Sequence, residues 1–181
     1  MSRAYFNEEQ KFRQPWMMAI IFSPIAIWIF TLAFAFSNDK DMDNESRVTL
    51  IISSIVIAGI TFLLLKVKLV TRIREDGIHY RFFPFHLKEK TIPKEDIKAY
   101  EIRKYRPIAE YGGWGLRAGL RGHGRAINVS GNMGLQLYLK NGKKLLFGTQ
   151  KPAEIGKAME AMMKMVKIDI AALELAADSS N

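Results

Sequence analysis

The sequence predicts an α+β protein in which an N-terminal two-helix transmembrane hairpin precedes a small β-barrel or sandwich, closed by a C-terminal amphipathic helix. Two long apolar runs predict the hairpin, short alternating runs predict the strands, and an apolar stripe near the end predicts the closing helix. We expect residues 1–65 to form the N-terminal segment and hairpin, and residues 66–181 to form one domain.

The two apolar runs, residues 17–36 and 48–65, contain no charged residue. A bilayer core of roughly 30 Å is crossed by about 20 residues of helix, so each run can form one span. An alternative is a cleaved signal peptide, because Ala33-Phe34-Ala35 resembles a cleavage site. The first run is longer than the signal core of about 7–15 residues, which favours a span.

Basic residues near the span ends predict the orientation of the hairpin. Three Lys/Arg precede the first run and four closely follow the second, whereas the connecting residues 37–47 hold two. We therefore expect a multi-pass protein of the inner (cytoplasmic) membrane with both termini in the cytoplasm. Residues 66–181 carry 22 Lys/Arg against 12 Asp/Glu. Attraction to anionic lipid explains this basic excess more simply than nucleic acid does.

The strands of the second part follow one another at short intervals. Residues 66–74 alternate between apolar and basic side chains, and Glu75-Asp76-Gly77 then predicts a hairpin turn into the strand of Ile78, Tyr80 and Phe82. Residues 91–93 lead into a third strand near 97–103. Further strands are expected at 125–129, 135–139 and 144–147, with Asn141-Gly142 as the turn between the last two.

A closing helix is predicted from Pro152, which suits the first helical turn because it lacks an N–H. Residues at helical spacing form its apolar stripe: Ile155, Ala158, Met159, Met162, Met163 and Val166. We expect these methionines to fill the core, and the alternative is an adaptable docking groove. Residues 168–177 could extend the helix.

Three stretches, 68–82, 92–97 (Ile-Pro-Lys-Glu-Asp-Ile) and 145–152, occur in an order that resembles the pleckstrin-homology-like (PH-like) fold. More narrowly, they resemble the bacterial membrane-anchored PH-like domain families of unknown function. The resemblance covers roughly residues 66–167 and implies a fold rather than an activity. Eukaryotic PH domains that bind phosphoinositides use a long basic loop between their first two strands. Here that connection is the short, acidic Glu75-Asp76-Gly77, so we expect that pocket to be absent.

Eight of the 13 glycines lie between Gly112 and Gly134, and basic and aromatic residues are interspersed among them. Six form our candidate ligand or partner site: Tyr111, Trp114, Arg117, Arg121, His123 and Arg125. The segment could bind a protein partner or an anionic lipid, or it could be a structural loop with glycine bulges and solvated arginines. Residues 119–126 have P-loop glycine spacing, but Arg125 and Ala126 replace the required Lys and Ser/Thr.

No catalytic, cofactor or metal site is predicted. The chain has no cysteine, which excludes thiolate catalysis and sulfur-bound zinc, and its three histidines are dispersed, with His79 expected at an ordinary surface position. The leading hypothesis is a non-enzymatic integral membrane protein whose cytoplasmic PH-like domain scaffolds or regulates a membrane-associated partner. The alternatives are a sensor of anionic lipid headgroups and an enzyme of membrane lipids.

Overall fold

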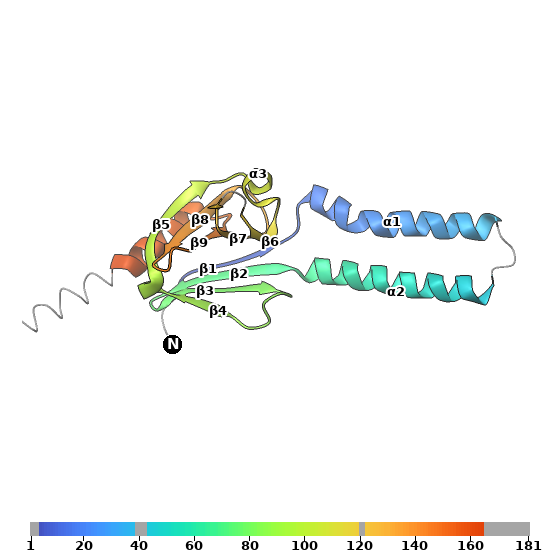
Figure 1. Cartoon of the computed structure of the whole chain (residues 1–181), viewed down its shortest axis with the longest axis horizontal. Coiled ribbons are helices and arrows are strands. Elements are labelled where there is room, and N and C mark those ends of the chain that lie inside the picture. The colour runs from blue at the N-terminus through green and yellow to red at the C-terminus, as the bar shows by residue number, and fades with distance from the viewer. Residues whose placement is uncertain (1–3, 39–42, 120–121, 165–181) are drawn as a thin grey trace, which may run out of the picture. The chain divides into compact units, whose positions relative to one another are not determined.

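The computed structural model describes residues 4–38, 43–119 and 122–164 (Figure 1). The chain divides into two compact units. Phe12–Val67 form the helical unit, and the residues on either side of this segment together form the β unit. This division differs from the expected boundary at residue 65 in where it places the N-terminal segment. Residues 4–11 belong to the β unit because they form a strand that pairs with the strand following the hairpin.

The helical unit consists of two long apolar helices, as predicted: α1 (Pro15–Asn38) and α2 (Asn44–Lys66). They are 24 and 23 residues long, which corresponds to about 35 Å each. Within this unit the helices run side by side, and Trp28 Nε1 donates to Ser53 Oγ across them at 3.3 Å (Figure 1). Most of their large apolar side chains are exposed, among them Ile27, Phe30, Ile55 and Phe62.

The first sheet of the β unit is antiparallel, with the strand order β1-β2-β3-β4. Its strands are β1 (Ala4–Lys11), β2 (Lys68–Arg74), β3 (Gly77–Phe83) and β4 (Lys90–Pro93). Arg74 lies opposite Gly77, which confirms the predicted hairpin turn. A Cβ at Gly77 would lie 2.2 Å from the carbonyl oxygen of Ile92, so only glycine lets β4 approach here.

The second sheet has five strands in the order β5-β8-β9-β7-β6. Its strands are β5 (Ile97–Lys104), β6 (Gly115–Ala118), β7 (Arg125–Asn128), β8 (Met133–Leu139) and β9 (Lys144–Gly148). All neighbours pair antiparallel except β7 and β9, which are parallel. The predicted strands from residue 97 onward are therefore present. The expected turn at Asn141-Gly142 joins β8 to β9, with Gly142 at φ 77°.

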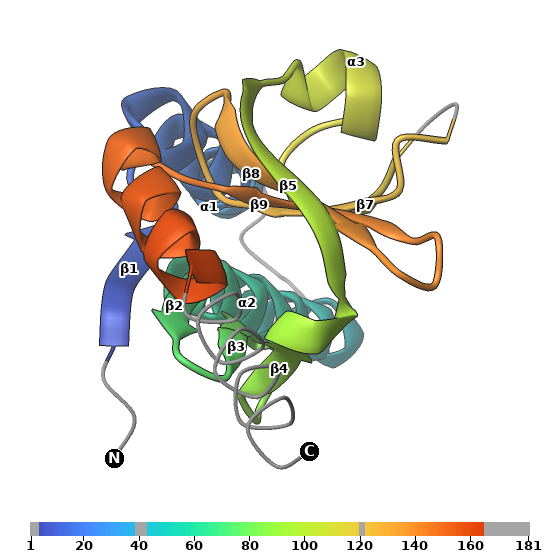
Figure 2. The same cartoon turned by 90° about the vertical axis from the view of Figure 1, so that its left-hand side faces the viewer.

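Three helical segments complete the β unit. The 3-10 turn η1 (Lys94–Asp96) joins the two sheets, and α3 (Pro107–Tyr111) follows β5. The C-terminal helix is described over residues 152–164 and is drawn in red beside β1 in Figure 2. Ile155, Met159 and Met162 are fully buried, which confirms them as core residues. Val166 and the suggested extension at 168–177 lie outside the described residues.

β1 joins the first sheet to the segment that enters the C-terminal helix. It pairs with β2 along its length, while the buried carboxylate of Glu8 accepts hydrogen bonds from Thr149 Oγ1 at 2.7 Å and Gln150 N at 2.8 Å. Gln10 Nε2 donates to the carbonyl oxygen of Gly148 at 2.7 Å. The N-terminal strand thus holds together parts of the β unit that lie about 140 residues apart in the chain.

Candidate functional site

Five of the six predicted site residues lie in the described part of the chain, and these five do not converge on one pocket. Tyr111 ends α3 and is buried, and its hydroxyl lies near His123. Trp114 lines one cavity and Arg125 lines another. Arg117 lines neither cavity, and its Nε donates to the Trp114 carbonyl oxygen at 3.0 Å. Arg121 lies outside the described residues.

Tyr111 and His123 belong to a polar network, which we define as Arg103, Glu110, Tyr111, His123 and Gln136. Arg103 Nη2 donates to Glu110 Oε2 at 2.8 Å, to Tyr111 Oη at 3.2 Å and to Gln136 Oε1 at 3.1 Å. Tyr111 Oη in turn donates to the carbonyl oxygen of His123 at 3.3 Å, and His123 Nδ1 lies 3.5 Å from Glu110 Oε2. The network holds α3 and the loop before β7 against the second sheet.

The charges of this network favour an ionised Glu110. Burial raises the pKa of Glu110, but hydrogen bonds from Arg103 and from the Arg106 N–H outweigh it and hold the pKa below 4.5. Burial also raises the pKa of Tyr111, and it raises the pKa of the neighbouring Tyr105 to about 12. At pH 7 the network therefore contains a charged Arg–Glu pair and the neutral phenol of Tyr111, and the neighbouring Tyr105 is neutral as well.

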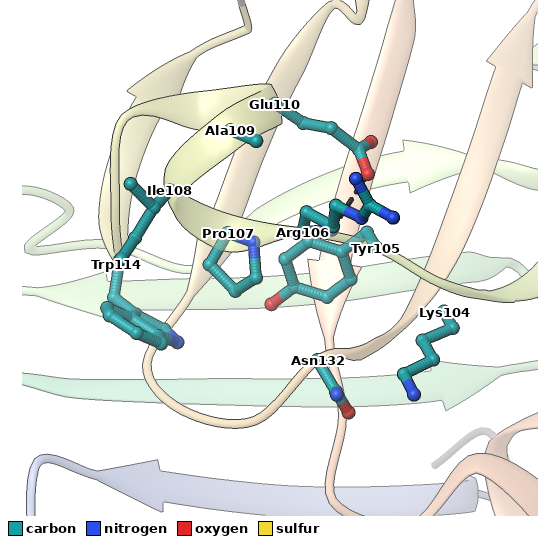
Figure 3. Close-up of a pocket in the computed structure, with 9 residues that line it drawn as sticks. All are labelled: Lys104, Tyr105, Arg106, Pro107, Ile108, Ala109, Glu110, Trp114 and Asn132. Atoms are coloured by element: carbon teal, nitrogen blue, oxygen red, sulfur yellow. Dashed lines mark hydrogen bonds between the residues drawn. The ribbon is translucent and has the colours of Figure 1, made fainter.

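One cavity, which we call the α3 groove, lies beside α3 and has a volume of about 610 Å³. Figure 3 shows Ile108 and Trp114 on one side of it, and Lys104 and Asn132 on the other. Ile108 is 68% exposed, a high value for a large apolar side chain. The indole Nε1 of Trp114 donates to the carbonyl oxygen of Gly131 at 3.2 Å, which holds the ring against the loop after β7.

The other cavity, which we call the basic cavity, has a volume of about 560 Å³ and lies between β3, the β6–β7 edge and the β8–β9 turn. Its lining residues combine apolar walls, cations and glycines: Tyr80, His86, Lys90, Leu116, Ala118, Gly122, Gly124, Arg125, Ile127, Leu139, Gly142, Lys143, Lys144 and Leu145. None of these described lining residues is acidic. Its cations form no ion pair with a carboxylate in the described part of the chain.

Gly124 positions the cations of the basic cavity. Its φ is +82°, and a Cβ there would lie 2.3 Å from the Lys144 carbonyl oxygen. Glycine therefore lets the β6–β7 loop touch the start of β9, where the parallel pairing sets Arg125 opposite Leu145. This brings the backbone of Arg125 close to that of Lys144, and both residues line the basic cavity. Gly124 in the glycine-rich segment thus has a structural role, because it allows the close backbone approach that positions Arg125.

The walls of the basic cavity remain uncharged at pH 7. Burial and the nearby Lys90 ammonium lower the pKa of His86 below 6.5, so its ring is neutral and packs edge-on against Tyr80. Burial raises the pKa of Tyr80, although the Arg125 guanidinium acts in the opposite direction. Ile127 is fully buried in the wall. The cavity therefore combines an apolar interior with an exposed cationic rim.

His79 corrects one expectation, because it is buried rather than at the surface. Its Nε2 lies 2.9 Å from Asp76 Oδ1 and its Nδ1 lies 2.9 Å from Thr91 Oγ1, so it links the β2–β3 turn to β4. Within residues 4–38, 43–119 and 122–164, no cluster of three or more His, Asp or Glu side chains could hold a metal ion.

Comparison with protein-family models, curated proteins and solved structures found no match to this chain. The sequence prediction missed several residues of both sites. Arg103, Glu110 and Gln136 come from three elements and share no sequence motif, so no local signal connects them. Lys143-Lys144 offered a signal, since two adjacent cations directly follow the predicted Asn-Gly turn.

Proposed function

We propose that this chain is a non-enzymatic integral membrane protein whose β unit scaffolds or regulates a membrane-associated partner. In this proposal α1 and α2 cross the inner membrane as a hairpin, and the β unit is a PH-like domain in the cytoplasm. The observation that carries the proposal is the pair of long helices with exposed apolar side chains, each directly connected to a strand of the same sheet.

The pairing of β1 with β2 supports two crossings rather than one. Lys11 lies opposite Lys68, and only a few residues separate them from the start of α1 and the end of α2. Both outer ends of the hairpin therefore connect to one sheet, which requires them to lie on the same side of a membrane. Cleavage after Ala35 would remove β1 from this sheet, which argues against a signal peptide. The basic residues flanking the hairpin favour the cytoplasm as that side.

The α3 groove is the surface that we assign to a protein partner. It combines the exposed Ile108 with Pro107 and Trp114, and aromatic and aliphatic anchors of this kind dominate the energetics of protein interfaces. The polar network braces α3 through Glu110, so the surface is held in place before a partner binds.

Cysteine accessibility tests the topology, because the chain has no cysteine of its own. A membrane-impermeant maleimide should label the Glu45→Cys variant in intact cells and the Glu75→Cys variant only after permeabilisation. Glu45 lies in the first turn of α2 and Glu75 in the β2–β3 turn. Labelling of both variants in intact cells would contradict the proposed side, and extraction of the protein by alkaline carbonate would contradict membrane integration.

Site-specific crosslinking tests the partner surface. A photoreactive amino acid at Ile108 should give a discrete adduct with a membrane protein, whereas the same group at Lys98, an exposed position of β5, should not. Trp114→Ala should abolish the adduct by removing the neighbouring anchor. Equal adducts at positions 108 and 98, or no adduct in native membranes, would count against a partner at the α3 groove.

A further inference from the structure

The basic cavity has a composition that the proposed scaffold does not explain. Its rim carries Lys90, Arg125, Lys143 and Lys144, all exposed, without any acidic residue among the described residues that line it. Like charges gathered in this way repel one another unless a negative charge is supplied. The lining also contains apolar side chains, including Leu116, Ile127 and Leu139, which a purely electrostatic surface would not need.

We propose that the basic cavity binds an anionic amphiphile, in which a phosphate or carboxylate is attached to a hydrocarbon chain. Arg125 and Lys144 hold the acidic group at the rim, and the chain lies against Leu116, Ile127 and Leu139. Arg can hold a phosphate through two parallel hydrogen bonds, and ammonium groups add further charge. The volume of about 560 Å³ lies within the range of roughly 300–1,000 Å³ that is usual for small-molecule sites.

The cavity favours an amphiphile over inorganic phosphate or nucleic acid. An isolated phosphate would use only the rim and leave the apolar wall in contact with water. Nucleic acid needs a track of cations along a surface, often with stacking aromatic rings, and this cavity closes on an apolar interior. Neither acidic residue of the β2–β3 turn is among the described residues that line the cavity. The ligand is therefore recognised through both charge and hydrocarbon.

Lysine footprinting tests the proposal on the full chain in phosphatidylcholine nanodiscs. An amine-reactive ester is applied, and mass spectrometry measures the modification rate of each lysine. One sample receives octyl phosphate, a second contains dioleoyl phosphatidic acid in the disc, a third receives inorganic phosphate and a fourth receives octyl glucoside. We expect either amphiphilic anion to slow modification of Lys144 and Lys90 at least fivefold. Lys98 and Lys157, which lie outside the cavity, should change less than twofold.

The arms distinguish the source of the ligand. Protection by phosphatidic acid alone identifies a membrane lipid, and protection by octyl phosphate alone identifies a soluble amphiphile. Protection in neither arm, equal protection by inorganic phosphate or octyl glucoside, or equal protection of Lys98 and Lys157 would overturn the proposal. These readouts do not depend on the hairpin topology or on the α3 groove, so failure here leaves the proposed function standing, and the reverse also holds.

Two variants separate the charged and apolar contributions. Arg125→Glu should remove at least four-fifths of the Lys144 protection, whereas the charge-matched Lys98→Glu should leave it unchanged. Ala118→Trp keeps every cation but fills the apolar part of the cavity, and it should also remove the protection. Arg125 and Ala118 are exposed positions on β7 and β6, at one edge of the second sheet. The unfolding temperature of each variant verifies that it folds. Full protection in Ala118→Trp would show that the hydrocarbon does not enter the cavity.

Discussion

Glu110 illustrates how a single residue can fix the position of a helix and a loop in the β unit. Its carboxylate accepts from the Arg103 guanidinium at 2.8 Å and from the Arg106 N–H at 2.7 Å, and His123 lies within 3.5 Å. Gly124 acts through the backbone, because a side chain there would meet the Lys144 carbonyl oxygen. Both residues act on the loop between β6 and β7, which joins the polar network to the basic cavity.

Glu110→Gln should lower the free energy of unfolding of the β unit by about 1.5–3 kcal/mol at pH 7, because charged hydrogen bonds are lost. The native pKa of Glu110 is depressed, so the stability that its ionised form contributes is present above the unfolded pKa of about 4.3 and is lost as pH falls through the native pKa. Denaturation from pH 3 to 8 should therefore show the variant and parent converging in acid. Glu154→Gln, at an exposed ion pair, is the control and should change little.

Gly124→Ala should destabilise the β unit more than Gly122→Ala does, by about 1–3 kcal/mol. Both glycines have positive φ, +82° and +79°, so both substitutions carry backbone strain. Only Gly124 faces backbone within 3 Å, whereas a Cβ at Gly122 meets nothing within 4 Å. The difference in unfolding temperature thus isolates the close approach to Lys144. Equal losses would mean that the positive φ alone explains the glycine.

At the scale of elements, β1 is one of the strands that the sequence prediction missed, together with the short β4 and β6. Its inward positions are Phe6, Glu8 and Gln10, so two polar residues replace the apolar side chains that alternation would require. Those polar residues reach partners that lie far along the chain, at residues 148–150. No local pattern in the sequence indicates such partners. The charged residues of this segment instead resemble a flank that only sets the orientation of the hairpin in the membrane.

Glu8→Ala should cost about 1.5–3 kcal/mol of β-unit stability, since it leaves the Thr149 hydroxyl and the Gln150 N–H without their acceptor. Glu9→Ala is the matched control, because this side chain points outward and forms only surface ion pairs with Lys11 and Lys68. That change should cost less than about 1 kcal/mol. Chemical denaturation of both variants gives the comparison, and equal costs would contradict the bridging role of β1.

At the scale of the whole chain, the helical unit is an insertion between two paired strands of the β unit. β1 ends at Lys11 directly opposite Lys68, where β2 begins, so the sheet contains both chain segments that flank the hairpin. The β unit is therefore complete only when the segment preceding α1 is present. This arrangement differs from a domain that simply follows a membrane anchor.

Replacing residues 12–67 by Asn-Gly should give a folded β unit that remains in solution. The two-residue turn can join antiparallel strands in this register, and the exposed apolar helices are removed. A chain beginning at Lys68 should instead aggregate or melt at a lower temperature, because it leaves the β2 edge unpaired and Thr149 without Glu8. Circular dichroism melting and gel filtration measure the two outcomes. Similar behaviour of both chains would contradict a structural role for β1.

The sequence by itself determined the two long apolar helices, the β2–β3 and β8–β9 hairpins and the buried face of the C-terminal helix. Each depends on a local signal: apolar length, an Asp-Gly or Asn-Gly turn, or helical spacing. Tertiary structure alone decided that β1 joins β2, that Arg103 meets Glu110 and that Arg125 and Lys144 line one cavity. These contacts join distant segments through strand pairing and close backbone approach. Neither kind of contact produces a periodic pattern in the sequence of the residues involved.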